Sequence, residues 1–101
     1  MTEFTERTLM IISEIPKGKV MTYGQVAYMA GSPKAARQVV RILHSMSEKY
    51  HLPWHRVVNK KGEIALLSDD AKMEQITRLE AEGITVQQGV INLEEFQWML
   101  E

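Results

Sequence analysis

Two closely spaced helix signals in the first half of the chain constrain the fold more than any other feature. Thr22 and Gln25 have the spacing of a capping box, in which the threonine side chain accepts from the amide three residues on and the glutamine reaches back. A short helix, GQVAYMA, is expected to follow and to end at Gly31. Ser32 is expected to cap a second helix with Pro33 at its first position. The pair predicts a helix-turn-helix.

The second helix of the pair is expected to run from Lys34 to about Met46 and to be amphipathic. Its inward residues are expected to be Val39, Ile42, Leu43 and Met46, and its outward residues Arg37, Arg41 and His44. In a generic helix-turn-helix this helix enters the major groove, and its N-terminus can receive a phosphate. The residues that it would offer to a duplex are Lys34, Arg37, Gln38 and Arg41.

An N-terminal helix and a small β element are predicted around this pair. The helix has one stripe formed by Phe4, Thr8, Ile11, Ile12 and Ile15. It must end at Pro16, because the residue before a proline is pushed out of the α region. Residues 54–58 and 63–66 predict two extended segments joined by NKKG, where Gly62 supplies a positive φ, so a hairpin or wing is expected.

Two further helices are predicted in the C-terminal part. Ser68 is expected to cap the first, which has an acidic first turn, ends at Gly83 and turns inward Met73, Ile76 and Leu79. Asn92 and Glu95 are expected to open the last helix, which would hold Phe96 and either Met99 or Leu100. The expected fold class is therefore mainly α with a small β element, a winged-helix-like helix-turn-helix. Residues 1–101 are expected to form one domain, because a chain of this length builds one core.

Charge is distributed unevenly along the chain. Residues 34–61 hold seven Lys and Arg against one acidic residue, and residues 62–101 hold nine acidic residues against two basic ones. All three histidines lie in the basic block. Such a block is typical of a face that binds a polyanion, although a merely solvated face is an equally open alternative.

Composition narrows the chemistry further. The chain has no cysteine, which excludes a disulfide framework, a thiolate zinc site and a thiol nucleophile. We expect no metal and no cofactor, and we interpret the seven methionines as core filler. No apolar run approaches the roughly 20 residues of a membrane span, so we expect a soluble, cytoplasmic protein without a membrane partner.

Three stretches together resemble a known family. IPKGKVMTYGQVAYMAGSPKAARQV, PWHRVV and LEAEG resemble the DNA-binding domain of the O6-alkylguanine-DNA alkyltransferases. More narrowly they resemble the alkyltransferase-like proteins, which keep that domain and replace its reactive cysteine, commonly with tryptophan. The resemblance covers roughly residues 4–86 and implies the alkyltransferase C-terminal type of fold. The amino-terminal domain common in the transferases is expected to be missing.

On the DNA side, the resemblance implies that the second helix lies in the minor groove, where sequence readout is weak. Tyr23 matches the tyrosine that crowds a phosphate and helps turn the damaged nucleotide out of the duplex. Arg37 matches the arginine finger that fills the gap in the base stack. The expected DNA-binding residues are Tyr23, Ser32, Lys34, Ala36, Arg37 and Gln38.

The resemblance also implies a pocket for the flipped base. Trp54 stands where the transferases place their nucleophile, although a core-only role for this indole stays an alternative. The expected alkylguanine pocket is formed by Tyr23, Pro53, Trp54, Val57 and Leu67. His55 and Glu82 match the groups that activate the missing cysteine. Here they are expected to be structural and, with Arg56, to brace the pocket through hydrogen bonds.

The sequence departs from the transferases at four positions. Val40 and Arg41 replace a usual glycine region and Met46 a hinge asparagine, which would alter how closely the helix approaches DNA. Leu67 stands where a pocket tyrosine occurs, which predicts a more apolar pocket that accepts bulky adducts as well as methyl.

The resulting hypothesis is a monomeric, non-enzymatic sensor of O6-alkylguanine in double-stranded DNA. By family analogy it would pass the lesion to nucleotide excision repair proteins. A helix-turn-helix transcription regulator with base-specific operators is the first alternative. A protein-interaction module that uses its acidic C-terminal half is the second.

Overall fold

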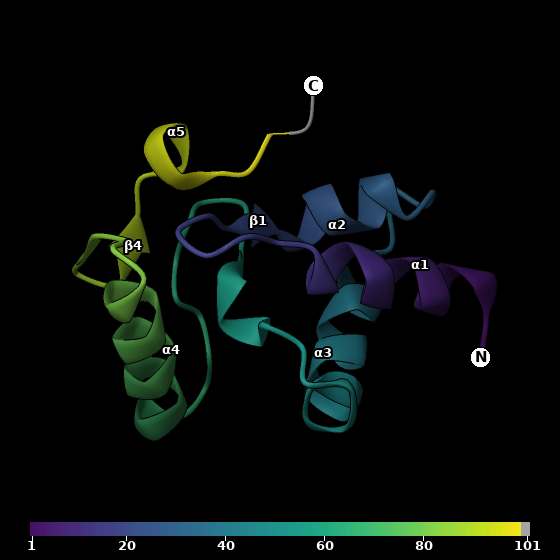
Figure 1. The fold of residues 1–101 in the computed structure, drawn as a ribbon, viewed down its shortest axis with the longest axis horizontal. Helices are drawn as coiled ribbons and strands as arrows, with labels where there is room; N and C mark the ends of the chain where they lie inside the picture. Colours follow the sequence, from purple (N-terminus) through teal and green to yellow (C-terminus); the bar gives the residue numbers. More distant parts are fainter. Residues whose placement is uncertain (100–101) are drawn as a thin grey trace.

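The computed structural model describes residues 1–99, in which helices predominate and the strands are short (Figure 1). The helical segments are α1 (Glu3–Ser13), α2 (Tyr23–Met29), α3 (Ala36–Tyr50), the 3-10 turn η1 (Trp54–Arg56), α4 (Asp69–Ala81) and α5 (Leu93–Phe96). The strands are β1 (Met21–Thr22), β2 (Val57–Val58), β3 (Val86–Gln87) and β4 (Val90–Ile91). The predicted fold class, mainly α with a small β element, is confirmed.

The first helix of the helix-turn-helix begins and ends as predicted. The amide of Gln25 donates to Thr22 Oγ1 at 3.0 Å and the amide of Thr22 donates to Gln25 Oε1 at 3.4 Å, which completes the capping box. At the other end, Gly31 has a φ of +95°, and the amide of Ser32 donates to the carbonyl of Ala27 at 3.0 Å. This is a Schellman C-cap, which leaves the chain turned toward α3.

The predicted start of the second helix is wrong. The α3 helix begins at Ala36, and Ala35, whose side chain makes no capping hydrogen bond, is its N-cap residue. Ser32 instead belongs to a turn, since its amide is bound to the end of α2 and its carbonyl accepts from the amide of Ala35 at 3.0 Å. Pro33 and Lys34 lie in this turn as well, so the helix starts two residues later than predicted.

The faces of α3 agree with the predicted pattern. Val39 and Ile42 are buried, and Leu43 and Met46 are partly buried. The exposed side carries Arg37, Gln38, Arg41 and His44. The helix is longer than expected and ends at Tyr50, and its C-cap residue His51 has a left-handed φ of 52°.

The predicted hairpin between residues 54–58 and 63–66 is wrong. Trp54 begins a 3-10 turn, and β2 pairs in parallel with β1 in the register Met21 with Val57. Val57 and Val58 are both buried, and a strand buried on both faces needs a covered partner, which a surface wing cannot supply. The turn itself is present as predicted, with Gly62 at a φ of +75°. The segment after it pairs with the β3–β4 hairpin instead, through a bridge between Glu63 and Val90.

The C-terminal helices follow their capping signals. Ser68 Oγ accepts from the amide of Ala71 at 3.0 Å, and Asn92 caps the short helix α5. The inward stripe of α4 is partly wrong, because Met73 is 60% exposed whereas Gln75 is buried. The last helix ends at Phe96, so Met99 lies beyond it, and Leu100 lies outside the described residues.

Two apolar clusters form the core, and the segment 52–58 connects them. Leu52 and Val57 belong to the cluster under α1, α2 and α3, whereas Val58 belongs to the cluster under α4. In Figure 1 this teal segment runs between α3 and α4. The 3-10 turn that carries Trp54 is therefore fixed between the two halves of the molecule. No helix within residues 1–99 is long and apolar enough to cross a membrane.

Candidate functional site

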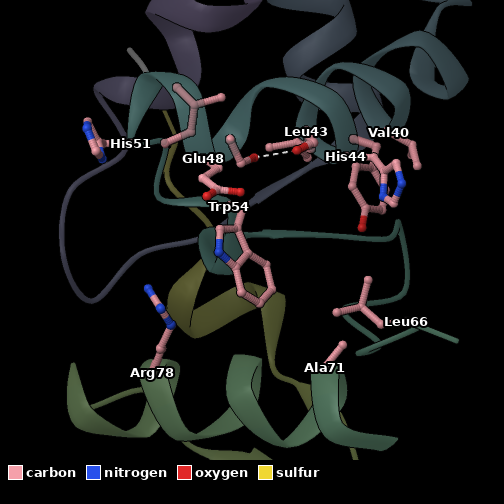
Figure 2. Close-up of a pocket in the computed structure, with 12 residues that line it drawn as sticks. Val40, Leu43, His44, Glu48, His51, Trp54, Leu66, Ala71 and Arg78 are labelled. Atoms are coloured by element: carbon pink, nitrogen blue, oxygen red, sulfur yellow. Dashed lines mark hydrogen bonds between the residues drawn. The ribbon is translucent and has the colours of Figure 1, made fainter. Parts of the chain in front are cut away.

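A cavity of about 650 Å³ opens between α3 and α4, and the indole of Trp54 projects into it (Figure 2). The α3 side is lined by Val40, Leu43, His44, Ser47, Glu48, His51 and Leu52. The remaining walls are Tyr23 at the start of α2, Trp54, Leu66, Ala71 and Arg78. The cavity is therefore largely apolar, with polar groups at its rim, as is typical of a ligand pocket.

Trp54 is held by the backbone and by two side chains. Its amide donates to the carbonyl of Leu52 at 2.8 Å, which fixes the entry into η1. The ring of His55 lies edge-on to the indole, with ring centroids 6.2 Å apart. The guanidinium of Arg78 lies 5.6 Å from the indole centroid, within the range of a cation–π interaction. The indole is thus oriented, yet one side remains open to the cavity.

Two of the five predicted pocket residues, Tyr23 and Trp54, line this cavity. Pro53 precedes η1 and Val57 is buried in the core, so neither side chain forms a wall. The prediction for Leu67 is wrong for this cavity, because its side chain is fully exposed and Leu66 forms the wall instead. The error is one of register: side chains alternate in extended backbone, and burial alternates from Ile64 to Leu67.

Behind the indole, Glu82 accepts hydrogen bonds from three residues, two in η1 and one in the connector after α1. His55 Nε2 lies 2.8 Å from Glu82 Oε2. Arg56 donates to the same carboxylate from Nε at 2.9 Å and from Nη2 at 2.7 Å, and its Nη1 donates to the carbonyl of Ile15 at 2.7 Å. The amide of Gly18 adds a contact of 3.2 Å. The structure thus brings His55, Arg56 and Glu82 together in one hydrogen-bonded network.

The network fixes the charge states of its members. Burial raises the pKa of Glu82, but the hydrogen bonds from Arg56, His55 and Gly18 outweigh it and lower the pKa to about 2. Burial lowers the pKa of His55 below 6.5, against the opposing effect of Glu82. His55 is then neutral at pH 7 and donates from Nε2 to the carboxylate. Its Nδ1 is buried and has no partner among the described residues.

Three of the six predicted DNA-binding residues are exposed on the helix-turn-helix and three are partly buried. Lys34, Arg37 and Gln38 are exposed, whereas Ser32 and Ala36 are partly buried. Lys34 and Arg37 form no salt bridge within residues 1–99, so their charges are available to a polyanion. Tyr23 is partly buried, and desolvation raises its pKa, which keeps the hydroxyl protonated.

The sequence reasoning missed two residues on α4. Arg78, which covers the indole, precedes Glu82 by one helical turn, and this spacing places the two side chains on one face of the helix. Gln75 donates from Nε2 to the carbonyls of His55 and Val57 at 3.1 and 3.2 Å, so it anchors the segment that carries the indole. Gln75 precedes Leu79 by four residues, and this spacing could have predicted that both lie on the buried face of the helix.

Comparisons with known proteins agree on one family. The family model described as the DNA-binding domain of 6-O-methylguanine DNA methyltransferase matches residues 3–84. A DNA base-flipping protein of Escherichia coli is 46% identical over 96 residues, which cover 94% of this chain and 74% of that protein. A DNA base-flipping protein of Vibrio parahaemolyticus is 43% identical and covers 97% of this chain and 98% of its own length.

Solved structures give the same result. An alkyltransferase-like protein of Schizosaccharomyces pombe, solved with damaged DNA that contains O6-carboxymethylguanine, superposes with a TM-score of 0.89 at 37% identity, covering 99% of this chain and 98% of that one. The O6-methylguanine methyltransferase of Mycobacterium tuberculosis superposes with a TM-score of 0.64 at 27% identity, covering 81% of this chain and 49% of that one. The chain therefore belongs to the alkyltransferase-like proteins, the family built on the DNA-binding domain of the O6-methylguanine DNA methyltransferases.

Proposed function

We propose that this protein is a non-enzymatic sensor that flips O6-alkylguanine out of double-stranded DNA and binds it without removing the alkyl group. The observation that carries the proposal is the position of Trp54, whose indole projects into the cavity between α3 and α4. A cavity of about 650 Å³ is large enough for a purine with a substituent.

The chemistry of the pocket supports capture without transfer. Dealkylation needs a sulfur lone pair, supplied as a thiolate by a neighbouring base, and this chain has no cysteine. The indole nitrogen lone pair belongs to the aromatic system, so Trp54 can stack on a purine but cannot accept an alkyl group. The pairing of His55 with Glu82 then serves to hold the η1 turn in place.

The exposed side of α3 supports a role on DNA. In this proposal the helix lies in the minor groove, Arg37 fills the gap in the base stack and Tyr23 crowds the phosphate of the flipped nucleotide. Unstacking costs about a few kcal/mol and costs less for a poorly paired, damaged base, which supplies part of the selectivity. The S. pombe relative in complex with damaged DNA, and the base-flipping proteins among the relatives, support the same role.

The bound complex would act as a signal. A lesion that is held but not repaired needs a downstream pathway, and we assign this step to nucleotide excision repair. A monomer with one exposed basic face suffices for the proposed binding.

Equilibrium titration with three duplexes tests the proposal. The duplexes carry O6-methylguanine, O6-benzylguanine or guanine at one position, and both adducts are expected to bind at least about tenfold more tightly than guanine, since one stacked base contributes about 1–3 kcal/mol. Intact-protein mass spectrometry after incubation should show no added alkyl group. Equal affinity for all three duplexes would refute lesion recognition, and a mass increase would refute capture without transfer.

A further inference from the structure

Arg78 is the one cation of fixed charge among the side chains that line the cavity within the described part of the chain. It projects from α4 over the indole of Trp54, with its guanidinium 5.6 Å from the ring centroid (Figure 2). The same side chain also lines a second cavity, of about 540 Å³, beside His55 and Glu82. Arg78 therefore lies at the edge of the main cavity, next to the residue against which a flipped base would stack.

The guanidinium has hydrogen-bonding capacity to spare. Its Nη2 pairs with Glu74 Oε2 at 2.8 Å one turn earlier on α4. Both side chains of this pair are about half exposed, and such pairs contribute little to stability. A guanidinium carries five N–H donors, so Arg78 can bind another acceptor without first breaking a strong contact.

The proposed function places the O6 substituent of the flipped base near this guanidinium. In the proposed function Trp54 stands where the resemblance puts the nucleophile of the transferases, and a substituent on O6 would therefore point toward the indole. Arg78 and the indole are in contact, so the terminal group of a longer substituent comes within reach of the guanidinium. Glu48 on α3 is the one carboxylate among the described lining residues. It would repel a negatively charged substituent and so would oppose the effect of Arg78.

We propose that Arg78 is a specificity-determining residue that reads the charge of the O6 substituent. The pocket then prefers an adduct that ends in a carboxylate over a neutral adduct of the same shape. Arg78 can form a charge-assisted, bidentate contact with a carboxylate, which a carboxamide cannot reproduce. The inference rests on the proposed function, since it assumes that the adduct enters this cavity.

The experiment compares two isosteric adducts in one duplex, O6-carboxymethylguanine and O6-carbamoylmethylguanine, with unmodified guanine as the reference. The unaltered protein is expected to bind the carboxylate about tenfold more tightly than the amide, which is the effect of one charge-assisted hydrogen bond. In Arg78→Gln the ratio of the two affinities should fall to about one. In Arg78→Lys, which keeps the charge but not the planar fork, an intermediate ratio is expected.

Two carboxylate variants serve as controls for the charges around Arg78. Glu74→Gln removes the helical partner of Arg78 but keeps the guanidinium, and it should preserve the preference. Glu48→Gln removes the opposing charge and should increase it. Thermal unfolding of each variant checks that the fold is intact.

The outcomes separate this inference from the proposed function. If neither adduct binds more tightly than guanine, the proposed function fails. If both adducts bind more tightly than guanine but with equal affinity, lesion recognition stands and the charge-reading role of Arg78 is wrong. A preference that survives in Arg78→Gln, or that disappears equally in Glu74→Gln, would also overturn it.

Discussion

Arg56 and Glu82 form a two-point ion pair, with distances of 2.9 and 2.7 Å, that joins the η1 turn to the end of α4. Both side chains are close to nine-tenths buried. The remaining guanidinium nitrogen, Nη1, donates to the carbonyl of Ile15, so the pair also holds the connector after α1. The position of the indole thus depends on a buried pair that does not itself line the main cavity.

Glu82→Gln is expected to destabilise the protein by about 3 kcal/mol, because it leaves a buried guanidinium without its counter-charge. Urea denaturation followed by circular dichroism measures the change. Glu80→Gln, an exposed substitution on the same helix, should change the free energy of unfolding by less than about 0.5 kcal/mol. Similar losses in the two variants would contradict a structural role for the network.

The free energy of unfolding is expected to decrease in two steps as the pH is lowered. The pKa of Glu82 is lowered from 4.5 to about 2, so its contribution is present above pH 4.5 and is lost as the pH falls toward 2. Burial lowers the pKa of His55 below 6.5, so the unfolded chain takes up this proton first and stability begins to fall below pH 6.5. Urea midpoints measured between pH 8 and pH 3 test both steps.

The first of these steps can be assigned by substitution. His55→Gln keeps a donor toward Glu82 but does not titrate, so the loss of stability below pH 6.5 should shrink. A step that persists in His55→Gln would have to come from another group.

Local signals in the sequence predicted local structure well. The capping box of Thr22, the C-cap at Gly31 and the cap at Ser68 each depend on residues within five positions, and each is present in the structure. Ser32 shows the limit, because it suits an N-cap by residue type, but a turn over Pro33 and Lys34 follows it. The α3 helix therefore begins later than predicted, at Ala36.

Nonlocal pairing could not be predicted from the sequence. The apolar pair Val57 and Val58 suits a surface hairpin as well as a core strand, and its partner, β1, lies 36 positions earlier in the register Met21 with Val57. The pocket wall depended on the same geometry, since a shift of one residue exchanges Leu66 for Leu67. The resemblance placed Trp54 and Glu82 correctly in one region, but it gave no position for Arg78.

Gly62→Ala is expected to destabilise the protein by at least about 2 kcal/mol. A Cβ at this position would clash with the carbonyl oxygen of Ile91, and the φ of +75° alone costs a non-glycine residue about 1–2 kcal/mol. Gly24→Ala is the matched control, because a Cβ added at this helical position would meet no atom within 4 Å. It should stabilise by about 0.5–1 kcal/mol. If Gly62→Ala left the free energy of unfolding unchanged, the close contact between the turn at residues 59–62 and β4 would be wrong.

Trp54→Ala is expected to weaken binding to an O6-methylguanine duplex by at least about tenfold, because one stacked base contributes about 1–3 kcal/mol. Binding to unmodified duplex should change little, since the indole projects into the cavity that would hold the flipped base. Trp54→Phe keeps an aromatic face and should retain most of the affinity. Trp98→Phe is the control, because Trp98 packs against the core cluster and does not line the cavity. Equal losses at both tryptophans would assign the effect to folding.

Arg37→Ala distinguishes the three classes of function. A sensor that fills the gap in the stack with this side chain should lose about tenfold or more in lesion affinity, because the flipped state loses its substitute for the missing base. A transcription regulator would instead lose one base preference, and a protein-interaction module would show no change in DNA binding.

Arg41→Ala, on the same exposed face of α3, is the control. It should weaken binding to all duplexes to a similar degree and reduce the slope of log affinity against log salt by about 0.9. The ratio of lesion to unmodified affinity, measured for both variants at two salt concentrations, separates the finger from a phosphate contact. If the ratio is unchanged in Arg37→Ala, this side chain does not occupy the gap.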